Sequence, residues 1–281
     1  VNLTNGDSDI PILIEHKATA DAHRTLGVWP NPSGCNEEQF SQCLERSNQI
    51  AEGVRHGHMA RLEALMGYRH IWLPSVGYPL SSWQLDEAQL HRVGMNATNA
   101  FLPKMGFART TCRKIIWGSK AYGGFGLTPL EDFQGVNQTT LFLQHFRLQD
   151  SVGKMLTIGY AWAQMFSGVS FQILSKPALP LPHASLGWFD HLRKFIGKIE
   201  VSIEVWPKFL RLPILLRNDD RNLMEAFLSL HRTPAKLCQL NLCRIYLQVE
   251  SLAELCDTDG TRLLPAAWNG VKLPSTSMVL W

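Results

Sequence analysis

The chain segment from residue 88 to residue 130 has the composition of a surface that binds polyanions. It contains six Lys or Arg residues and no Asp or Glu, although the whole protein has a net charge of only +3. Lys and Arg neutralise phosphates, so a local positive excess of this size is typical of a nucleic-acid-binding face. The candidate phosphate contacts are Arg92, Lys104, Arg109, Arg113, Lys114 and Lys120.

The same acid-free stretch also carries aromatic rings and a glycine cluster. Rings can stack on bases, although rings in this pattern also serve as core. The segment YGGFGL, Tyr122–Leu127, matches neither the dinucleotide fingerprint nor the phosphate loop. Gly123 and Gly124 are therefore expected to form a tight turn before the next helix, beside or within a nucleic-acid surface. The rings are Phe101, Phe107, Trp117, Tyr122 and Phe125.

One adjacent acid pair, Asp219-Asp220, raises the possibility of a magnesium site. Polymerases bind magnesium with such pairs, but there the pair lies on a hairpin with apolar flanks. Here the flanks are Asn218 and Arg221, so we expect an acid at a helix N-terminus instead. We assign no catalytic residue, metal or cofactor to this chain.

The elements that must position these residues are expected to be mainly helical, in an α+β class. The first 34 residues contain three strand-like segments, VNLT, IPILIEH and RTLGVWP, which predict a small antiparallel sheet. Apolar residues then recur at three- and four-residue spacing, which predicts a helical bundle. The proline-rich segment KPALPLPHA indicates a connector before further helices. The expected regions are 1–34, 35–175 and 184–281.

Composition also limits the class of protein. Six cysteines form no C-x-x-C pair, which favours reduced thiols and a nuclear or cytoplasmic protein that is not secreted. No apolar run approaches the roughly 18 residues of a membrane span, so we expect no membrane partner. A start at Val1 in a strand-like segment suggests a fragment of a longer product.

An ordered set of motifs resembles the reverse transcriptases of non-long-terminal-repeat, LINE-like retroelements. The segment RTLGV, Arg24–Val28, resembles the strand of the primer-grip region. The segment YRHIWLPSVGYPL, Tyr68–Leu80, is similar to a thumb segment, and Asn99–Phe107 and Tyr122–Leu127 follow in the family's order. The resemblance covers roughly Leu3 to Gln149, about half of the chain.

The resemblance implies the primer-grip and thumb part of an RNA-directed DNA polymerase with a helical C-terminal extension. Leu26, Gly27 and Val28 would be the primer-grip-like residues. The family's catalytic Asp-Asp hairpin would lie before Val1, so this chain alone would be inactive, and magnesium is expected only with the missing palm. The expected partners are a template–primer duplex, RNA–DNA or DNA, and the missing palm and fingers.

Two alternatives remain open at this point. The chain could be a non-catalytic helical protein, a degenerate or co-opted remnant that acts by protein interaction. It could also be an independent enzyme with an unrecognised site. An apolar-flanked Asp-Asp pair encoded upstream of Val1 would favour the polymerase interpretation over the non-catalytic one.

Overall fold

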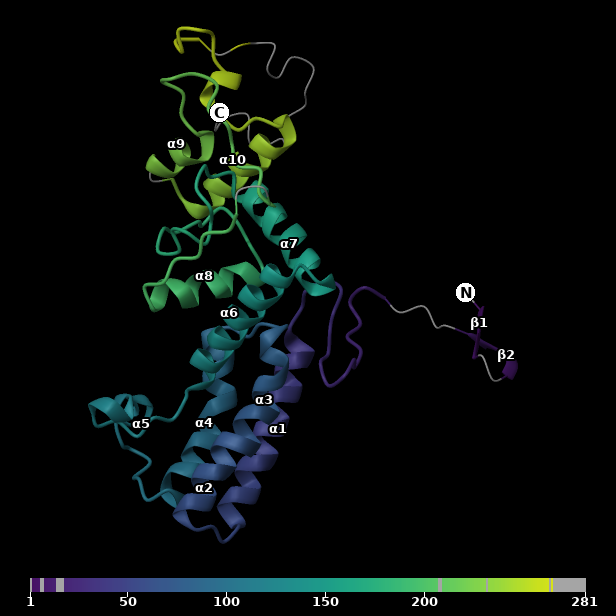
Figure 1. The fold of residues 1–281 in the computed structure, drawn as a ribbon, viewed down its shortest axis with the longest axis vertical. Coiled ribbons are helices and arrows are strands. Elements are labelled where there is room, and N and C mark those ends of the chain that lie inside the picture. Colours follow the sequence, from purple (N-terminus) through teal and green to yellow (C-terminus); the bar gives the residue numbers. More distant parts are fainter. Residues whose placement is uncertain are drawn as a thin grey trace. The chain divides into compact units, whose positions relative to one another are not determined.

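A computed structural model describes the backbone of residues 2–5 and 8–13, and residues 18–206, 209–230, 232–262 and 264 (Figure 1). It divides into two compact units, Val1–Gln134 and Gly135–Trp281. The division falls inside helix α6, Leu130–Leu148. The limits expected from the sequence, at residues 35, 175 and 184, stay a prediction.

The fold is mainly helical, as expected, but the predicted three-stranded N-terminal antiparallel sheet, and with it the α+β class, is wrong. Among the described residues, both large hydrophobic cores are built from helices and their connections, starting at Phe40. Near the N-terminus two short segments, β1 (Asn2–Asn5) and β2 (Ser8–Leu13), pair with each other alone. The third expected strand is a tight turn, because Leu26 and Gly27 have φ of 49° and 87°.

The first unit is organised around two long helices, α1 (Glu37–His56) and α4 (Glu87–Lys104), which pack against each other. Helix α1 follows Asn36, whose side chain makes no capping hydrogen bond. Helix α4 begins with a capping box in which the Gln89 backbone N–H donates to Asp86 Oδ1 at 2.8 Å. The connecting elements are α2 (Arg61–Gly67), the π-helical turn η1 (Tyr68–Trp72), α3 (Leu73–Gly77) and the 3₁₀ turn η2 (Tyr78–Ser81).

A buried chain of hydrogen bonds fixes these elements to one another. Trp72 Nε1 donates to Ser47 Oγ at 2.9 Å, and Ser47 Oγ donates to the Val93 carbonyl at 2.6 Å. Trp72 is 1% exposed, and the two partners are fully buried. Because buried polar groups are costly without partners, this chain specifies how η1, α1 and α4 meet.

The second unit has its own aromatic core. Phe142, Tyr160 and Leu192 are fully buried there, and Gly135 gives Phe195 room, because a Cβ at Gly135 would lie 2.1 Å from that ring. Among the described residues of this unit, the helices after α6 are α7 (Ser151–Ser167), α8 (Trp188–Lys198), α9 (Leu223–Ser229) and α10 (Pro234–Leu247), followed by the 3₁₀ turn η5 (Leu252–Glu254).

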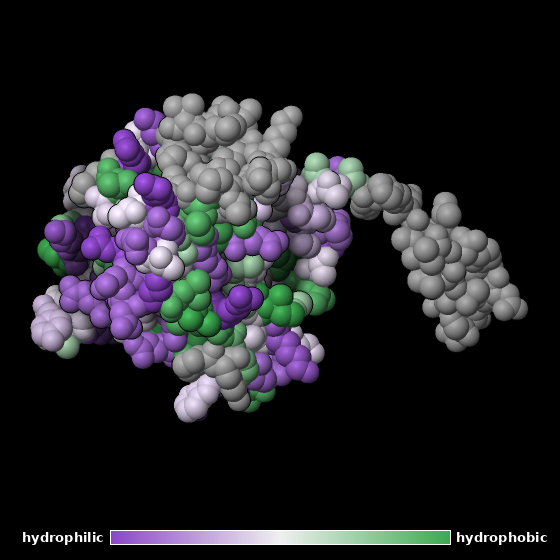
Figure 2. Space-filling view, turned by 90° about the horizontal axis from the view of Figure 1, so that it is seen from above, coloured by the Kyte–Doolittle hydropathy of each residue, from purple (hydrophilic) through white to green (hydrophobic). Residues whose placement is uncertain are grey.

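Hydrophobic side chains also reach the surface, where they lie among hydrophilic ones on the face seen in Figure 2. One row follows α7, with Met155, Ile158, Trp162 and Met165 exposed at helical spacing. Within the described residues, no helix combines the length and apolar character needed to cross a membrane.

Candidate nucleic-acid interface

The acid-free stretch leaves α4 and forms a side loop of the first unit before it enters α6. The loop contains the short helix α5 (Arg113–Trp117) and the 3₁₀ turn η3 (Lys120–Tyr122). Figure 1 shows α5 beside α1–α4 and outside their bundle. Ile116 is fully buried in the first core, so one apolar anchor fixes α5 to the unit.

Glycines close this loop because they allow two segments of its backbone to approach each other closely. A Cβ at Gly124 would lie 2.1 Å from the Gly118 carbonyl oxygen, so only glycine fits there. The Gly126 N–H donates to the Gly118 carbonyl at 2.8 Å, and the Phe125 N–H donates to a carbonyl of α5 at 2.8 Å. Gly123 has a φ of 80°, the left-handed conformation. Gly123 and Gly124 therefore form the tight turn that the sequence indicates.

A second set of bonds ties the end of the loop to the π-helical turn. The Tyr68 hydroxyl donates to the Thr128 carbonyl at 2.9 Å, and the Arg69 guanidinium donates to the Gly126 carbonyl at 2.9 Å. Burial raises the pKa of the Tyr68 hydroxyl, so this group stays a donor. Sequence reasoning did not assign these roles, because the partners are 60 and 57 residues apart.

Three of the six candidate cations are engaged within the first unit. The Arg92 guanidinium lies 4.9 Å from the centroid of an aromatic ring of α1. Lys104 Nζ donates to a backbone carbonyl after α1 at 2.8 Å. Arg113 donates to Asn99 Oδ1 at 3.0 Å and is half-buried. These contacts hold the loop and α4 in place and leave part of each charge facing outward.

The other three cations, Arg109, Lys114 and Lys120, are exposed. In the part of the chain that the structure describes, none of their side chains makes a hydrogen bond or an ion pair, and all three ion pairs found there lie elsewhere. With no acid between residues 88 and 130, nothing on the loop itself neutralises them. The loop thus presents uncompensated positive charge to solvent.

The five rings of the stretch divide into core and surface. Phe101 is 1% exposed, and Phe107 packs edge-to-face on Phe125 with centroids 4.6 Å apart. Trp117 is 39% exposed and Tyr122 is 93% exposed. Trp117 and Tyr122 are therefore the most exposed of the five rings, and both lie on the segment that carries Lys114 and Lys120.

The primer-grip-like residues take a different form from the expected strand. Thr25 and Val28 exchange backbone hydrogen bonds of 2.7 and 2.9 Å, which makes Leu26 and Gly27 the corner of a two-residue turn. Leu26 is 87% exposed at this corner. The functional role expected for Leu26, Gly27 and Val28 stays a prediction.

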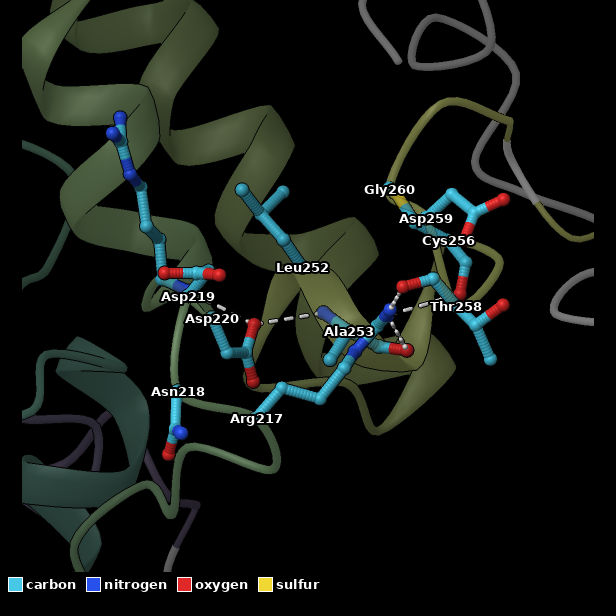
Figure 3. Close-up of a pocket in the computed structure, with 11 residues that line it drawn as sticks. Arg217, Asn218, Asp219, Asp220, Leu252, Ala253, Cys256, Thr258, Asp259 and Gly260 are labelled. Atoms are coloured by element: carbon cyan, nitrogen blue, oxygen red, sulfur yellow. Dashed lines mark hydrogen bonds between the residues drawn. The ribbon is translucent and has the colours of Figure 1, made fainter.

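One acid of the Asp219-Asp220 pair, Asp220, is hydrogen-bonded to the backbone of the second unit (Figure 3). Asp220 accepts from the N–H groups of Leu216, Arg221 and Ala253 at 2.9 Å each. Partial burial raises the pKa of Asp220, but the hydrogen bonds together lower it by more. The pKa of Asp220 is therefore below its ordinary value. Helix α9 begins at residue 223, so the acid pair lies before the helix and outside its first turn.

Arg217, in the same pocket, has its guanidinium directed at the chain after η5 (Figure 3). It donates to the carbonyls of Asp257 and Thr258 at 2.6 and 2.5 Å, and to those of Ala253 and Cys256 at 3.2 and 3.3 Å. The Arg217 guanidinium is therefore already bound by backbone carbonyls of the second unit.

No group of three His, Cys, Asp or Glu side chains is placed to hold a metal ion in the described segments. Comparison of the chain with protein-family models, curated proteins and solved structures found no match.

Proposed function

We propose that this chain binds nucleic acid through the loop that contains α5 and η3, by contacts to the phosphate backbone. The observation that carries the proposal is the set of three exposed cations, Arg109, Lys114 and Lys120, on a loop without acids. A cation that the fold has not already paired can release counterions from a phosphate when it binds. Such contacts position a duplex and carry no sequence information.

The closed geometry of the loop favours this use. Gly124 against Gly118 and the bonds from Tyr68 and Arg69 fix the loop before a ligand arrives. A site whose backbone is already ordered loses less conformational entropy on binding than a flexible tail. The exposed charges are thereby held together on one loop.

The resemblance to LINE-like reverse transcriptases suggests which nucleic acid is bound. In this proposal the chain is a primer-grip and thumb fragment, and its ligand is a template–primer duplex, RNA–DNA or DNA. Polymerisation would require the missing palm with its acids and magnesium. The chain by itself then binds without catalysing.

The test is fluorescence anisotropy with a labelled RNA–DNA hybrid at low salt. A variant with Arg109→Glu, Lys114→Glu and Lys120→Glu should bind at least about 30-fold more weakly, since a phosphate that no longer meets a cation releases no counterion on binding. All three side chains are exposed, so circular dichroism should show an unchanged fold.

A matched control separates the site from net charge. The variant with Arg232→Glu, Lys236→Glu and Arg262→Glu has the same change in net charge and alters three exposed cations of the second unit. It should bind within about threefold of the unaltered chain, because the remaining effect is long-range and screened by salt. Equal losses in both variants would contradict the proposal.

A second candidate function, protein interaction without catalysis, is favoured by the exposed row on α7. Ile158 is 70% exposed and Met155 65%, and Trp162 and Met165 continue the row. Exposed apolar rows often mark interaction surfaces. A folded chain that does not bind the hybrid at low salt would favour this candidate over the first.

A further inference from the structure

We propose that Tyr122 stacks on an unpaired base, so that the loop recognises the junction between a duplex and a single strand. This inference rests on the proposed nucleic-acid binding and assigns a ligand to one further residue of the same loop. Tyr122 is 93% exposed, and its neighbours Lys120 and Gly123 are exposed as well.

The ring of Tyr122 is presented by an ordered backbone. The Tyr122 N–H donates to the Ser119 carbonyl at 3.0 Å, and the Gly124 N–H donates to the same carbonyl at 3.0 Å. Ser119 Oγ also accepts from the Ala121 N–H at 3.2 Å. The backbone that carries the ring is therefore fixed, and a tyrosine has few side-chain torsions to restrict on binding.

The ring is uncovered, and so is the residue that follows it. A Cβ built at Gly123 would meet no atom within 4 Å, so the residue after Tyr122 is open to solvent. Lys120 and Lys114 supply positive charge on the same loop. A flat ring, open space and cations together match the way proteins hold single-stranded nucleic acid, with bases on rings and phosphates on cations.

The chemistry of the duplex decides which base can be reached. Inside a duplex both faces of every base are covered by neighbouring bases, so a protein ring can stack only on a base that is unpaired or terminal. Cations on the same loop bind the duplex backbone without this restriction. Tyr122 would therefore contribute to binding where a single strand leaves the duplex.

The experiment compares Tyr122→Ala with the unaltered chain on two labelled ligands. One is an RNA–DNA hybrid with a single-stranded overhang, and the other is a long blunt hybrid whose interior outnumbers its ends. We expect Tyr122→Ala to weaken binding to the overhang ligand by about five- to 150-fold, the range for one stacked base. Binding to the blunt hybrid should change by less than about twofold, since no unpaired base is present there.

Two further variants control for shape and for general exposure. Tyr122→Phe keeps the ring and should bind the overhang ligand as the unaltered chain does. Tyr246→Ala removes an exposed tyrosine of the second unit, 53% exposed on α10, and should leave both affinities unchanged. A fluorescent adenine analogue as the first unpaired base should be quenched by the chain and not by Tyr122→Ala.

The outcomes separate this inference from the function on which it rests. Unchanged overhang binding in Tyr122→Ala, or equal losses on both ligands, would overturn the stacking role. If the charge-reversed variant loses affinity while Tyr122→Ala does not, phosphate binding stands and stacking falls. If the unaltered folded chain binds neither ligand, both proposals fail together.

Discussion

The carbonyl-bound arginines of the second unit and the exposed cations on the loop of the first unit are used in opposite ways. In the second unit, Arg193, Arg217 and Arg244 direct their guanidinium groups at backbone carbonyls, and two of them are nearly fully buried. In the first unit, Lys114 and Lys120 are exposed on a loop without acids. A positive charge can bind a ligand only when the fold has not already satisfied it. Formal charge counts do not make this distinction, but the hydrogen bonds do.

The largest effect that would sharpen this comparison is expected at Arg244, which is 3% exposed. It donates to the carbonyls of Met165 and Phe166 at 2.7 and 3.2 Å and to Asn241 Oδ1 at 3.0 Å. Arg244→Met keeps the apolar stem but removes the donor to the Met165 carbonyl, while the Phe166 carbonyl keeps the Asn241 amide as a donor at 2.9 Å. We expect a loss of about 3 kcal/mol in the free energy of unfolding, from urea denaturation. A loss below about 1 kcal/mol would mean that water replaces the guanidinium.

The next effect concerns the loop that presents the free charges. Gly124→Ala places a methyl group against the Gly118 carbonyl and should open the loop at a cost of about 2 kcal/mol. The amides of Phe125 and Leu127, which donate to carbonyls of α5, should then exchange hydrogen faster. Gly123→Ala is the matched control, because the added methyl group would meet no atom within 4 Å. Its only cost is the strain of placing alanine at a φ of 80°, about 1 kcal/mol of stability. Equal protection in both variants would contradict the close backbone contact.

A pH effect is expected from His183, which is 3% exposed and whose Nε2 donates to the Ser167 carbonyl at 2.7 Å. Burial lowers the pKa of His183; the Ser167 carbonyl raises it less, and the charges of Arg244 and Arg193 lower it further. The unfolded chain then binds this proton at higher pH than the folded chain does. Stability should fall as the pH drops below the ordinary histidine pKa of about 6.5, by at most about 1.4 kcal/mol per pH unit. His183→Gln should flatten this part of the stability profile, and an unchanged profile would assign it to another group.

The smallest effect is expected at the free cations themselves. Arg109→Met removes an exposed charge without a partner among the described residues, so the free energy of unfolding should change by less than about 0.5 kcal/mol. Arg109→Met and Arg244→Met make the same substitution, one at an exposed arginine without a partner among the described residues and one at a buried arginine bonded to carbonyls. A loss of about 2 kcal/mol or more at Arg109 would show that the fold depends on this charge and would remove it from the proposed interface.

Local patterns predicted the helices of this chain better than its N-terminal region. The apolar residues at three- and four-residue spacing after residue 34 predicted helices, and α1 is one of them, with Phe40, Cys43 and Val54 buried. The segment RTLGV has strand-forming residue types, but Leu26 and Gly27 form the corner of a turn. Strand propensity is decided by pairing and burial, and a short segment does not contain that information.

The sequence predicted the residue composition of the candidate site but not the contacts that hold its loop in place. The absence of acids between residues 88 and 130 can be read directly from the sequence. The partners of Tyr68 and Arg69 lie 60 and 57 residues away, so spacing could not reveal them. The role of Gly124 could be predicted only as a turn, because the backbone that it contacts, at Gly118, is defined by the folded loop.

The most direct test of the central claim is the salt dependence of binding to the RNA–DNA hybrid. If the free cations contact phosphates, the logarithm of the affinity should fall linearly with the logarithm of salt concentration, with a slope of about 0.7–0.9 per phosphate contacted. Changing Arg109, Lys114 and Lys120 to Gln should reduce that slope by about one for each residue. An identical slope in the unaltered and triple-substituted chains would contradict the account, because binding would then not involve these charges.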